Sequence, residues 1–167
     1  LGLMVHNSGN NINFVYVACG TASTVQVSFH HQGDDTWYHI AVTWDTTADE
    51  VKAYVNGAQV GSTSSSLGTW SGSVSVVTMG KNTTADNGYY HGHIGQTALF
   101  SVALTAAQIA DLTNGGTPSN IYNHASRASL KGWWQFLEGS GTSFADSSGT
   151  GNTGTLVNGT TFNTDKP

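Results

Sequence analysis

The stretch Thr36–Gly61, TWYHIAVTWDTTADEVKAYVNGAQVG, predicts a strand, a loop, a second strand, a tight turn and a third strand. Residues 37–44 alternate as a half-buried strand does, and Glu50–Val55 forms the next such run. Asn56 and Gly57 follow, and this dipeptide accepts the positive φ angles of a two-residue type I′ turn. The stretch therefore predicts an antiparallel hairpin at the centre of an all-β fold.

Composition excludes one class of partner and favours a β-rich fold. The chain of 167 residues has 5 Lys and Arg against 10 Asp and Glu, a formal charge of −5, and lacks a basic stripe for a phosphate backbone. We therefore expect no nucleic-acid partner. Only 9% of residues are charged, while 21 are Gly, which is typical of many short strands joined by turns. The 5 Trp, 6 Tyr and 6 Phe supply apolar area for a packed core.

The fold must stand on packing, because the one cysteine, Cys19, has no partner for an internal disulfide. No apolar run approaches the roughly 20 residues that span a bilayer, so no membrane insertion is expected. The chain opens in LGLMV without an initiating Met, which suggests a mature or incomplete chain.

Further strands are expected along the whole chain because short β-branched and aromatic runs alternate with turn residues. They are Leu1–Val5, Ile12–Cys19, Val25–Phe29, Ser73–Gly80, one or two within Tyr89–Ser101, Ser129–Leu137 and Thr155–Val157. Strands and helices do not alternate along this chain, as they would in a protein with a parallel sheet. The residues therefore predict an antiparallel β-protein.

One short helix is predicted at Leu104–Ile109. Thr105 stands where an N-cap is needed and Gln108 follows three residues later, which is the capping-box pattern. Gly115 and Gly116 are expected to end the helix.

Several of these runs, in this order and spacing, resemble the laminin-G-like branch of the concanavalin A-like lectin/glucanase superfamily. The resemblance covers residues 1–118 and implies a jelly-roll β-sandwich. It is carried by Trp37–Asp45, Val51–Gly57, Val77–Gly80, Tyr90–Ile94 and Leu104–Pro118.

A second resemblance concerns the C-terminal part. Leu130–Gly141 and Ala145–Leu156 are similar to the way such domains begin. The resemblance divides the chain into a sandwich lacking its opening strands (1–118), a connector (119–128) and a segment similar to a domain opening (129–167). A tandem array cut within a unit, a permuted unit and strand exchange between neighbouring chains would each explain this order.

The resemblance also predicts a partner for the aromatic run Leu130–Leu137. In laminin-G-like domains the opening strand lies beside strands near the end of the domain, which here means Ile94–Phe100. We therefore expect these two segments to pair, within one chain or between neighbouring chains.

Catalysis is not expected. Retaining glycoside hydrolysis needs two carboxyl groups roughly 5 Å apart. The only glutamates, Glu50 and Glu138, are far apart in sequence, and the adjacent Asp34 and Asp35 would face opposite sides of a strand. The sequence predicts a protein that is not an enzyme.

Calcium is the metal that the resemblance implies, because laminin-G-like domains often carry a calcium ion at the rim. Asp146, in the Gly-rich run ADSSGTGN, is the candidate ligand, since calcium takes carboxylate and carbonyl oxygens. The alternative is an Asx turn that shapes the loop. Against calcium, Gly95 and Gln96 stand where the family often has acidic residues.

Four loop residues are candidates for ligand contact: Trp70, Asp86, Asn87 and Tyr89. Exposed aromatic rings stack against sugars, while amides and carboxylates bond hydroxyl groups. The alternative is that these side chains merely cover the core.

The sequence thus favours a non-catalytic extracellular, cell-surface or virion-surface module that binds glycan or protein ligands. The alternative is a structural subunit of an extracellular filament, appendage or virion, a homo-oligomer or polymer assembled through strand exchange.

Overall fold

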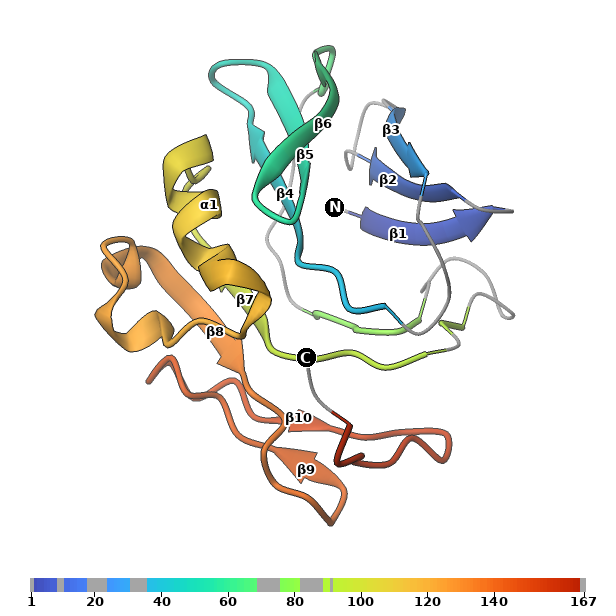
Figure 1. Cartoon of the computed structure of the whole chain (residues 1–167), viewed down its shortest axis with the longest axis vertical. Coiled ribbons are helices and arrows are strands. Elements are labelled where there is room, and N and C mark those ends of the chain that lie inside the picture. Colours follow the sequence, from blue (N-terminus) through green and yellow to red (C-terminus); the bar gives the residue numbers. More distant parts are fainter. Residues whose placement is uncertain are drawn as a thin grey trace. The chain divides into compact units, whose positions relative to one another are not determined.

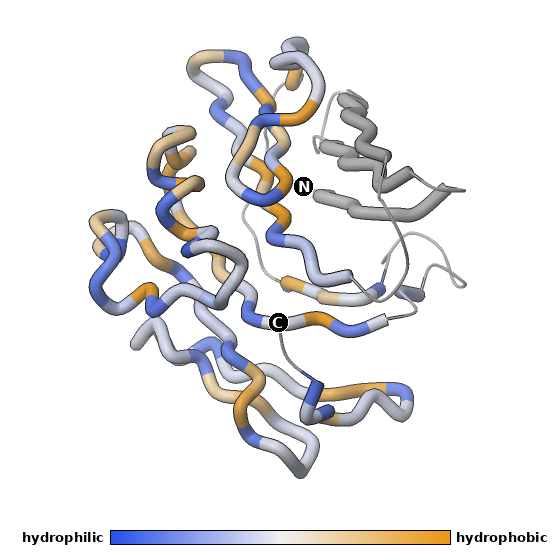
Figure 2. The backbone as a smooth tube through the Cα atoms, in the orientation of Figure 1, coloured by the Kyte–Doolittle hydropathy of each residue, from blue (hydrophilic) through white to orange (hydrophobic). Residues whose placement is uncertain are grey.

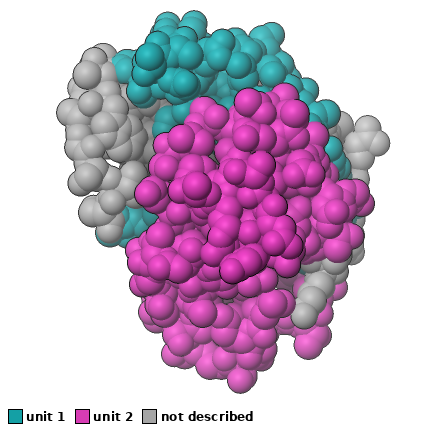
Figure 3. All heavy atoms as spheres, turned by 90° about the vertical axis from the view of Figure 1, so that its left-hand side faces the viewer, with its two compact units in different colours: residues 1–92 teal, residues 93–167 magenta. Residues whose placement is uncertain are grey.

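A computed structural model of the chain describes residues 2–8, 11–17, 24–30, 36–68, 76–81, 89–90 and 92–165, with side chains in these ranges from residue 36 onward. The chain forms two compact units, Leu1–Gly92 (unit 1) and His93–Pro167 (unit 2). Figure 3 colours the two units separately.

Unit 1 contains two antiparallel three-stranded sheets, in which neighbours along the chain are neighbours in the sheet. The strands are β1 (Gly2–Ser8), β2 (Asn11–Val17), β3 (Thr24–His30), β4 (Ile40–Asp45), β5 (Glu50–Val55) and β6 (Ala58–Ser64). Each sheet is a meander, as Figure 1 shows.

The central hairpin is confirmed. Asn56 and Gly57 have φ angles of 49° and 81°, as a type I′ turn requires. The first strand, however, begins at Ile40 and not at Trp37. At this end of the ladder His39 N donates to the Asn56 side-chain oxygen (2.9 Å) in place of a backbone carbonyl, while Asn56 N donates to His39 O (2.8 Å). The side chain of a turn residue therefore replaces one backbone acceptor where β4 begins.

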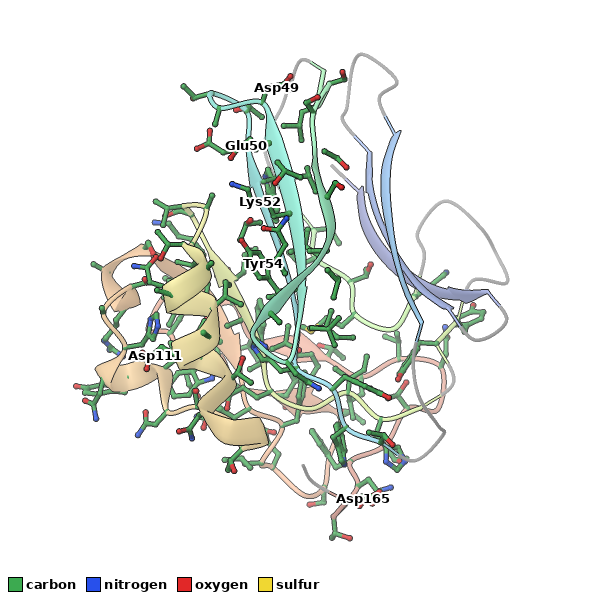
Figure 4. All side chains as sticks on the ribbon, turned by 45° about the horizontal axis from the view of Figure 1, so that its top comes forward. Asp49, Glu50, Lys52, Tyr54, Asp111 and Asp165 are labelled. Atoms are coloured by element: carbon green, nitrogen blue, oxygen red, sulfur yellow. The ribbon has the colours of Figure 1, made fainter. Side chains whose placement is uncertain are left out.

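The core of the β4–β6 sheet is closed by hydrogen bonds to the Asp49 carboxylate. Val51 and Leu67 are 2% and 0% exposed, and Val42 and Trp44 pack against them. The Asp49 carboxylate accepts hydrogen bonds from Leu67 N (2.8 Å) and from the preceding N–H (3.0 Å). These bonds, which lower the pKa of Asp49, hold Leu67 over the sheet. Asp49 lies where β4 turns into β5 (Figure 4).

In the part of the chain that Figure 2 colours by hydropathy, hydrophobic and hydrophilic residues are interspersed along the backbone. Within the described ranges, no helix has the length and apolar character needed to cross a membrane.

Unit 2 combines short strands with the helical turns between them. In chain order the elements are β7 (Thr97–Phe100), α1 (Ala106–Thr113), η1 (Asn114–Gly116), η2 (Ile121–Asn123), η3 (Arg127–Ser129), β8 (Leu130–Trp134), β9 (Ser143–Phe144) and β10 (Gly154–Thr155). β7 pairs with β8 and β9 pairs with β10, both antiparallel. The described chain is thus mainly antiparallel β-structure with one short α-helix, as predicted.

The predicted capping box is confirmed. Gln108 N donates to Thr105 Oγ1 (3.3 Å), and Thr105 N donates to Gln108 Oε1 (2.9 Å). The helix runs past Ile109 to Thr113 and ends at Asn114, whose left-handed conformation (φ 45°, ψ 42°) supplies the C-cap. Asn therefore takes the role that was expected of the following glycines.

The pairing predicted for the aromatic run is confirmed within the chain. Thr97 lies opposite Trp134 and Ala98 lies opposite Trp133 in the β7–β8 ladder. Both tryptophans are 5% exposed, so the strand buries a ring at successive positions. Gly132 makes this possible, because a Cβ there would collide with the Trp134 indole. The three-part division of the family unit itself stays a prediction.

Other strand predictions need correction. Residues 73–75 of the predicted strand Ser73–Gly80 lie outside the described residues, whereas residues 76–78 have no regular structure and Lys81 makes an isolated bridge with Tyr89. β8 stops at Trp134, before Leu137, and β9 was not predicted. The last strand ends at Thr155, not at Val157. Short apolar runs in Gly-rich sequence predict strands only where a partner is within reach.

Ending the chain after Tyr122 should destabilise unit 2, because the truncation removes the pairing partner of β7 together with Trp133 and Trp134. We expect a lower melting temperature and aggregation or altered association, measured by calorimetry and light scattering. A truncated chain that stayed soluble with unchanged melting temperature and association state would show that β8 is dispensable.

A point variant isolates the packing contribution. Trp134→Ala should lower the free energy of unfolding by about 3–5 kcal/mol, because a large buried ring leaves a cavity. Leu137→Ala is the control, since Leu137 is 62% exposed; its effect should stay within about 0.5 kcal/mol. Chemical denaturation measures both, and equal effects would contradict the assignment.

Candidate functional site

Tyr89 is the predicted ligand residue that the structure describes. The other three, Trp70, Asp86 and Asn87, lie outside the described residues. Tyr89 is 45% exposed and makes an antiparallel bridge with Lys81. The Lys81 ammonium lies 5.4 Å from the centre of the Tyr89 ring, a cation–π distance. An exposed ring held by a backbone bridge and a cation offers a stacking surface to a ligand.

The neighbouring residue adds a second exposed ring. Tyr90 is 55% exposed, and its N–H donates to Gly80 O (2.8 Å). Together with the bridge between Lys81 and Tyr89, this bond pairs the segment that ends at Lys81 with the segment that begins at Tyr89. Two exposed tyrosines therefore follow one another in this backbone-paired segment of unit 1.

Asp146 lies in unit 2, where its carboxylate organises the loop after β9. Oδ1 accepts from Trp133 N (2.9 Å) and from Ser148 N (2.8 Å). Oδ2 accepts from Asn152 N (2.9 Å) and from Thr150 Oγ1 (2.8 Å). Both oxygens thus bind donors of the chain, one of which belongs to β8.

These contacts change the acidity of the carboxyl group. Partial burial raises the pKa of Asp146, but the Ser148 hydroxyl and the N–H groups of Trp133, Ser148 and Asn152 outweigh it. The pKa therefore lies well below its ordinary value of 3.8, because these donors stabilise the charged form. Asp146 is a carboxylate throughout the neutral range.

The calcium prediction meets a donor set that does not fit it well. N–H and O–H donors occupy both Asp146 oxygens, whereas calcium requires several oxygen ligands. Among the residues that the structure describes, no group of three or more His, Cys, Asp and Glu side chains could hold a metal ion. The geometry matches the loop-shaping alternative, and calcium at Asp146 stays a prediction.

The described carboxylates serve local contacts. Glu50 Oε2 lies 2.6 Å from Lys52 Nζ on the same strand (Figure 4). Glu138 Oε1 accepts from Ala145 N (2.7 Å). Hydrogen-bond or ion-pair partners within the same unit are found for Asp45, Asp49, Glu50, Asp111, Glu138, Asp146 and Asp165. These contacts give each described carboxylate a partner within its own unit.

A polar depression at the end of α1 was not predicted from the sequence. It is lined by Asp111, Asn114, Ser119, Asn120, Asn123 and His124. Four of these residues belong to the predicted connector, 119–128. The available signal was the density of Asn around Tyr122, an aromatic residue in an otherwise polar segment.

Comparison with known proteins gives a family and two structural likenesses. A laminin-G family model, described as the concanavalin A-like lectin/glucanases superfamily, matches residues 1–110. No curated protein matches the chain.

A solved structure from Bacteroides ovatus, provisionally described as a carbohydrate-binding protein, is similar over 93% of this chain with a TM-score of 0.63 and 18% identity. The match spans 44% of that protein, so this chain corresponds to less than half of it. An S-layer domain-containing protein of Clostridium thermocellum is 29% identical over 61% of this chain and 51% of its own, with a TM-score of 0.43.

Asp146→Ala should lower the melting temperature in the presence of EDTA, because it removes the acceptor of several loop donors. We expect a loss of about 1–3 kcal/mol at neutral pH. The unfolded chain takes up the proton near pH 3.8 while the folded chain stays ionised, so falling pH favours unfolding. The difference between wild type and variant should therefore be full at pH 7 and shrink below about pH 4.

The same pair of proteins tests calcium. If Asp146 binds the ion, added calcium should raise the melting temperature of the wild type and not that of Asp146→Ala. An equal calcium response in both proteins would discard Asp146 as a ligand and leave its loop-shaping role intact.

Proposed function

Because this chain belongs to the concanavalin A-like lectin/glucanase superfamily, as a laminin-G-like member, we propose that it is a non-catalytic module that binds a glycan. The exposed Tyr89 ring, oriented by Lys81, carries the proposal. Aromatic rings bind the apolar face of a sugar, and their burial supplies much of the affinity of such sites.

The composition of the neighbouring segment supports a sugar over a charged ligand. Lys81–Tyr89 contains one basic and one acidic residue, Lys81 and Asp86, among amides, hydroxyls and small residues. Neutral hydrogen-bonding groups match the hydroxyl groups of a sugar, because each can donate and accept. The carbohydrate-binding description of the Bacteroides protein supports the same ligand class. A protein ligand is the alternative that binding assays must address.

The proposed location is extracellular or on a surface, where glycans are displayed. A cation–π contact and a backbone bridge at Tyr89 need no reducing or oxidising environment, so this site would function there unchanged.

A structural subunit assembled through strand exchange stays the second prediction. Within the chain, β8 already pairs with β7 and buries both of its tryptophans. Exchange of this strand would require that pairing to break. We therefore rank ligand binding above assembly, and light scattering over a range of concentrations measures the association state directly.

Binding to an immobilised panel of neutral and anionic glycans tests the proposal. We expect Tyr89→Ala to weaken binding roughly tenfold, because the stacking ring is lost. Tyr89→Phe should retain most of the affinity. Val157→Ala, which trims a side chain that is 62% exposed in unit 2, is the surface control. No binding by the wild type, or equal binding by Tyr89→Ala, would refute the assignment.

Incubation with polysaccharides should release no reducing ends above a buffer blank, because the described carboxylates are engaged in structural contacts. Turnover that an Asp or Glu substitution abolished would contradict the non-catalytic assignment.

A further inference from the structure

The polar depression of unit 2 has the size of a small-ligand site. Its volume of about 290 Å³ is just below the lower limit, about 300 Å³, of the usual range for such sites. This is room for one sugar ring and not for a longer chain lying within it. Figure 4 shows Asp111 projecting from α1, the element that forms one side of the depression.

The walls of the depression are held by capping interactions. The Asn114 N–H donates to Asp111 O as the helix ends. The Ser119 hydroxyl donates to Leu112 O, which brings the following chain back to the helix terminus. Asn120 then caps η2, since its Oδ1 accepts from Tyr122 N (3.0 Å). Each bond uses a helix-terminal group, so the wall is a consequence of how the helix stops.

His124 supports the depression from within the unit. Its side chain is 4% exposed, and its Nδ1 accepts from Ser126 N (3.1 Å). The ring proton is therefore on Nε2, which faces Gln108 O (3.3 Å) and the Asp111 Oδ2 atom (3.4 Å). The Asp111 side chain is 73% exposed. A buried imidazole thus orients a carboxylate that is still open to a ligand.

The remaining polar groups of the wall are available. Within the described part of the chain, the side-chain amides of Asn114 and Asn123 make no hydrogen bond. Each amide can both donate and accept, as can a sugar hydroxyl group. An anion would be repelled by Asp111, and a single carboxylate among amides is a weak site for a cation. The chemistry therefore favours a neutral ligand rich in hydroxyl groups.

Tyr122 does not line the depression itself, but it is the chain neighbour of Asn123, which does, and it carries an exposed aromatic ring. It follows Ile121 in η2, the turn that also carries Asn123, and it is 60% exposed. The Arg127 guanidinium lies 3.8 Å from the ring centre and restrains its orientation. The stacked guanidinium covers one face, so the exposed area belongs to the rest of the ring. A sugar ring can stack there.

We propose that Asp111, Asn114 and Asn123, which line the depression, and Tyr122, the neighbour of Asn123 in the chain, form a binding site for a single neutral sugar residue, a site additional to the one at Tyr89. The amides and the carboxylate bind hydroxyl groups, and Tyr122 stacks against the sugar. The inference shares its ligand class with the proposed function but depends on other residues, in unit 2.

Saturation-transfer NMR with free monosaccharides tests this site, with glucose, galactose, mannose and N-acetylglucosamine as probes. At least one should receive saturation from the wild type. Asn123→Ala and Tyr122→Ala should each weaken its affinity roughly tenfold, since each removes one kind of contact. Tyr122→Phe should bind normally, because the ring is kept.

Tyr89→Ala is the matched control, since it removes a tyrosine of similar exposure from unit 1. It should leave monosaccharide binding unchanged while weakening the glycan-panel binding assigned to Tyr89. Binding that survived both Asn123→Ala and Tyr122→Ala, or that only Tyr89→Ala removed, would overturn the second site and leave the proposed function standing. No saturation of any probe would also overturn it, as would a preference for inorganic phosphate.

Discussion

The antiparallel pairing of β7 with β8 is the constraint on which most of unit 2 depends. It joins residues 30 to 37 positions apart, from Phe100 with Leu130 to Thr97 with Trp134, and lets successive tryptophans be buried on one short strand. Ser101 closes the ladder, because its N–H donates to Ser129 O (2.8 Å). α1 and the three short helical turns lie between these closing residues. The polar depression therefore lies in a long loop whose two ends are joined by the β7–β8 ladder.

Hydrogen bonds between side chains and the backbone stabilise the loops of this chain, as disulfides or ion pairs do in other small domains. Asp49 holds Leu67 over the sheet of unit 1, and Asp146 joins its own loop to β8 in unit 2. Asn56 likewise ties the hairpin turn to the start of β4. Each polar side chain satisfies backbone donors that a loop would otherwise expose to solvent. Such hydrogen bonds can fix the conformation of long Gly-rich loops in a chain that has few ion pairs, since only 9% of its residues are charged.

The two proposed sites share one design. In each, a cationic side chain restrains an exposed tyrosine, Lys81 at Tyr89 and Arg127 at Tyr122. A restrained ring loses less conformational entropy when a ligand stacks on it. Polar amides near Tyr122 then supply orientation. Restraint of the ring is thus the feature that the two proposals have in common.

Elements defined by neighbouring residues were predictable from sequence. The Asn56-Gly57 turn and the Thr105–Gln108 capping box follow from backbone angles and hydrogen bonds within a few positions. The partner of β8 was predicted through the family resemblance, because no local rule links residues 97 and 134.

Other features were decided by contacts between residues that are distant in sequence. The start of β4 depends on Asn56, seventeen residues beyond His39, and the role of Asp146 depends on β8. The polar depression exists only because Ser119 and His124 return to the end of α1. Sequence alone determined the all-β class, the turn and the helix cap, since these obey local stereochemistry. Tertiary structure decided which polar residues stay free for a ligand, because that depends on which backbone groups the folded chain leaves unsatisfied.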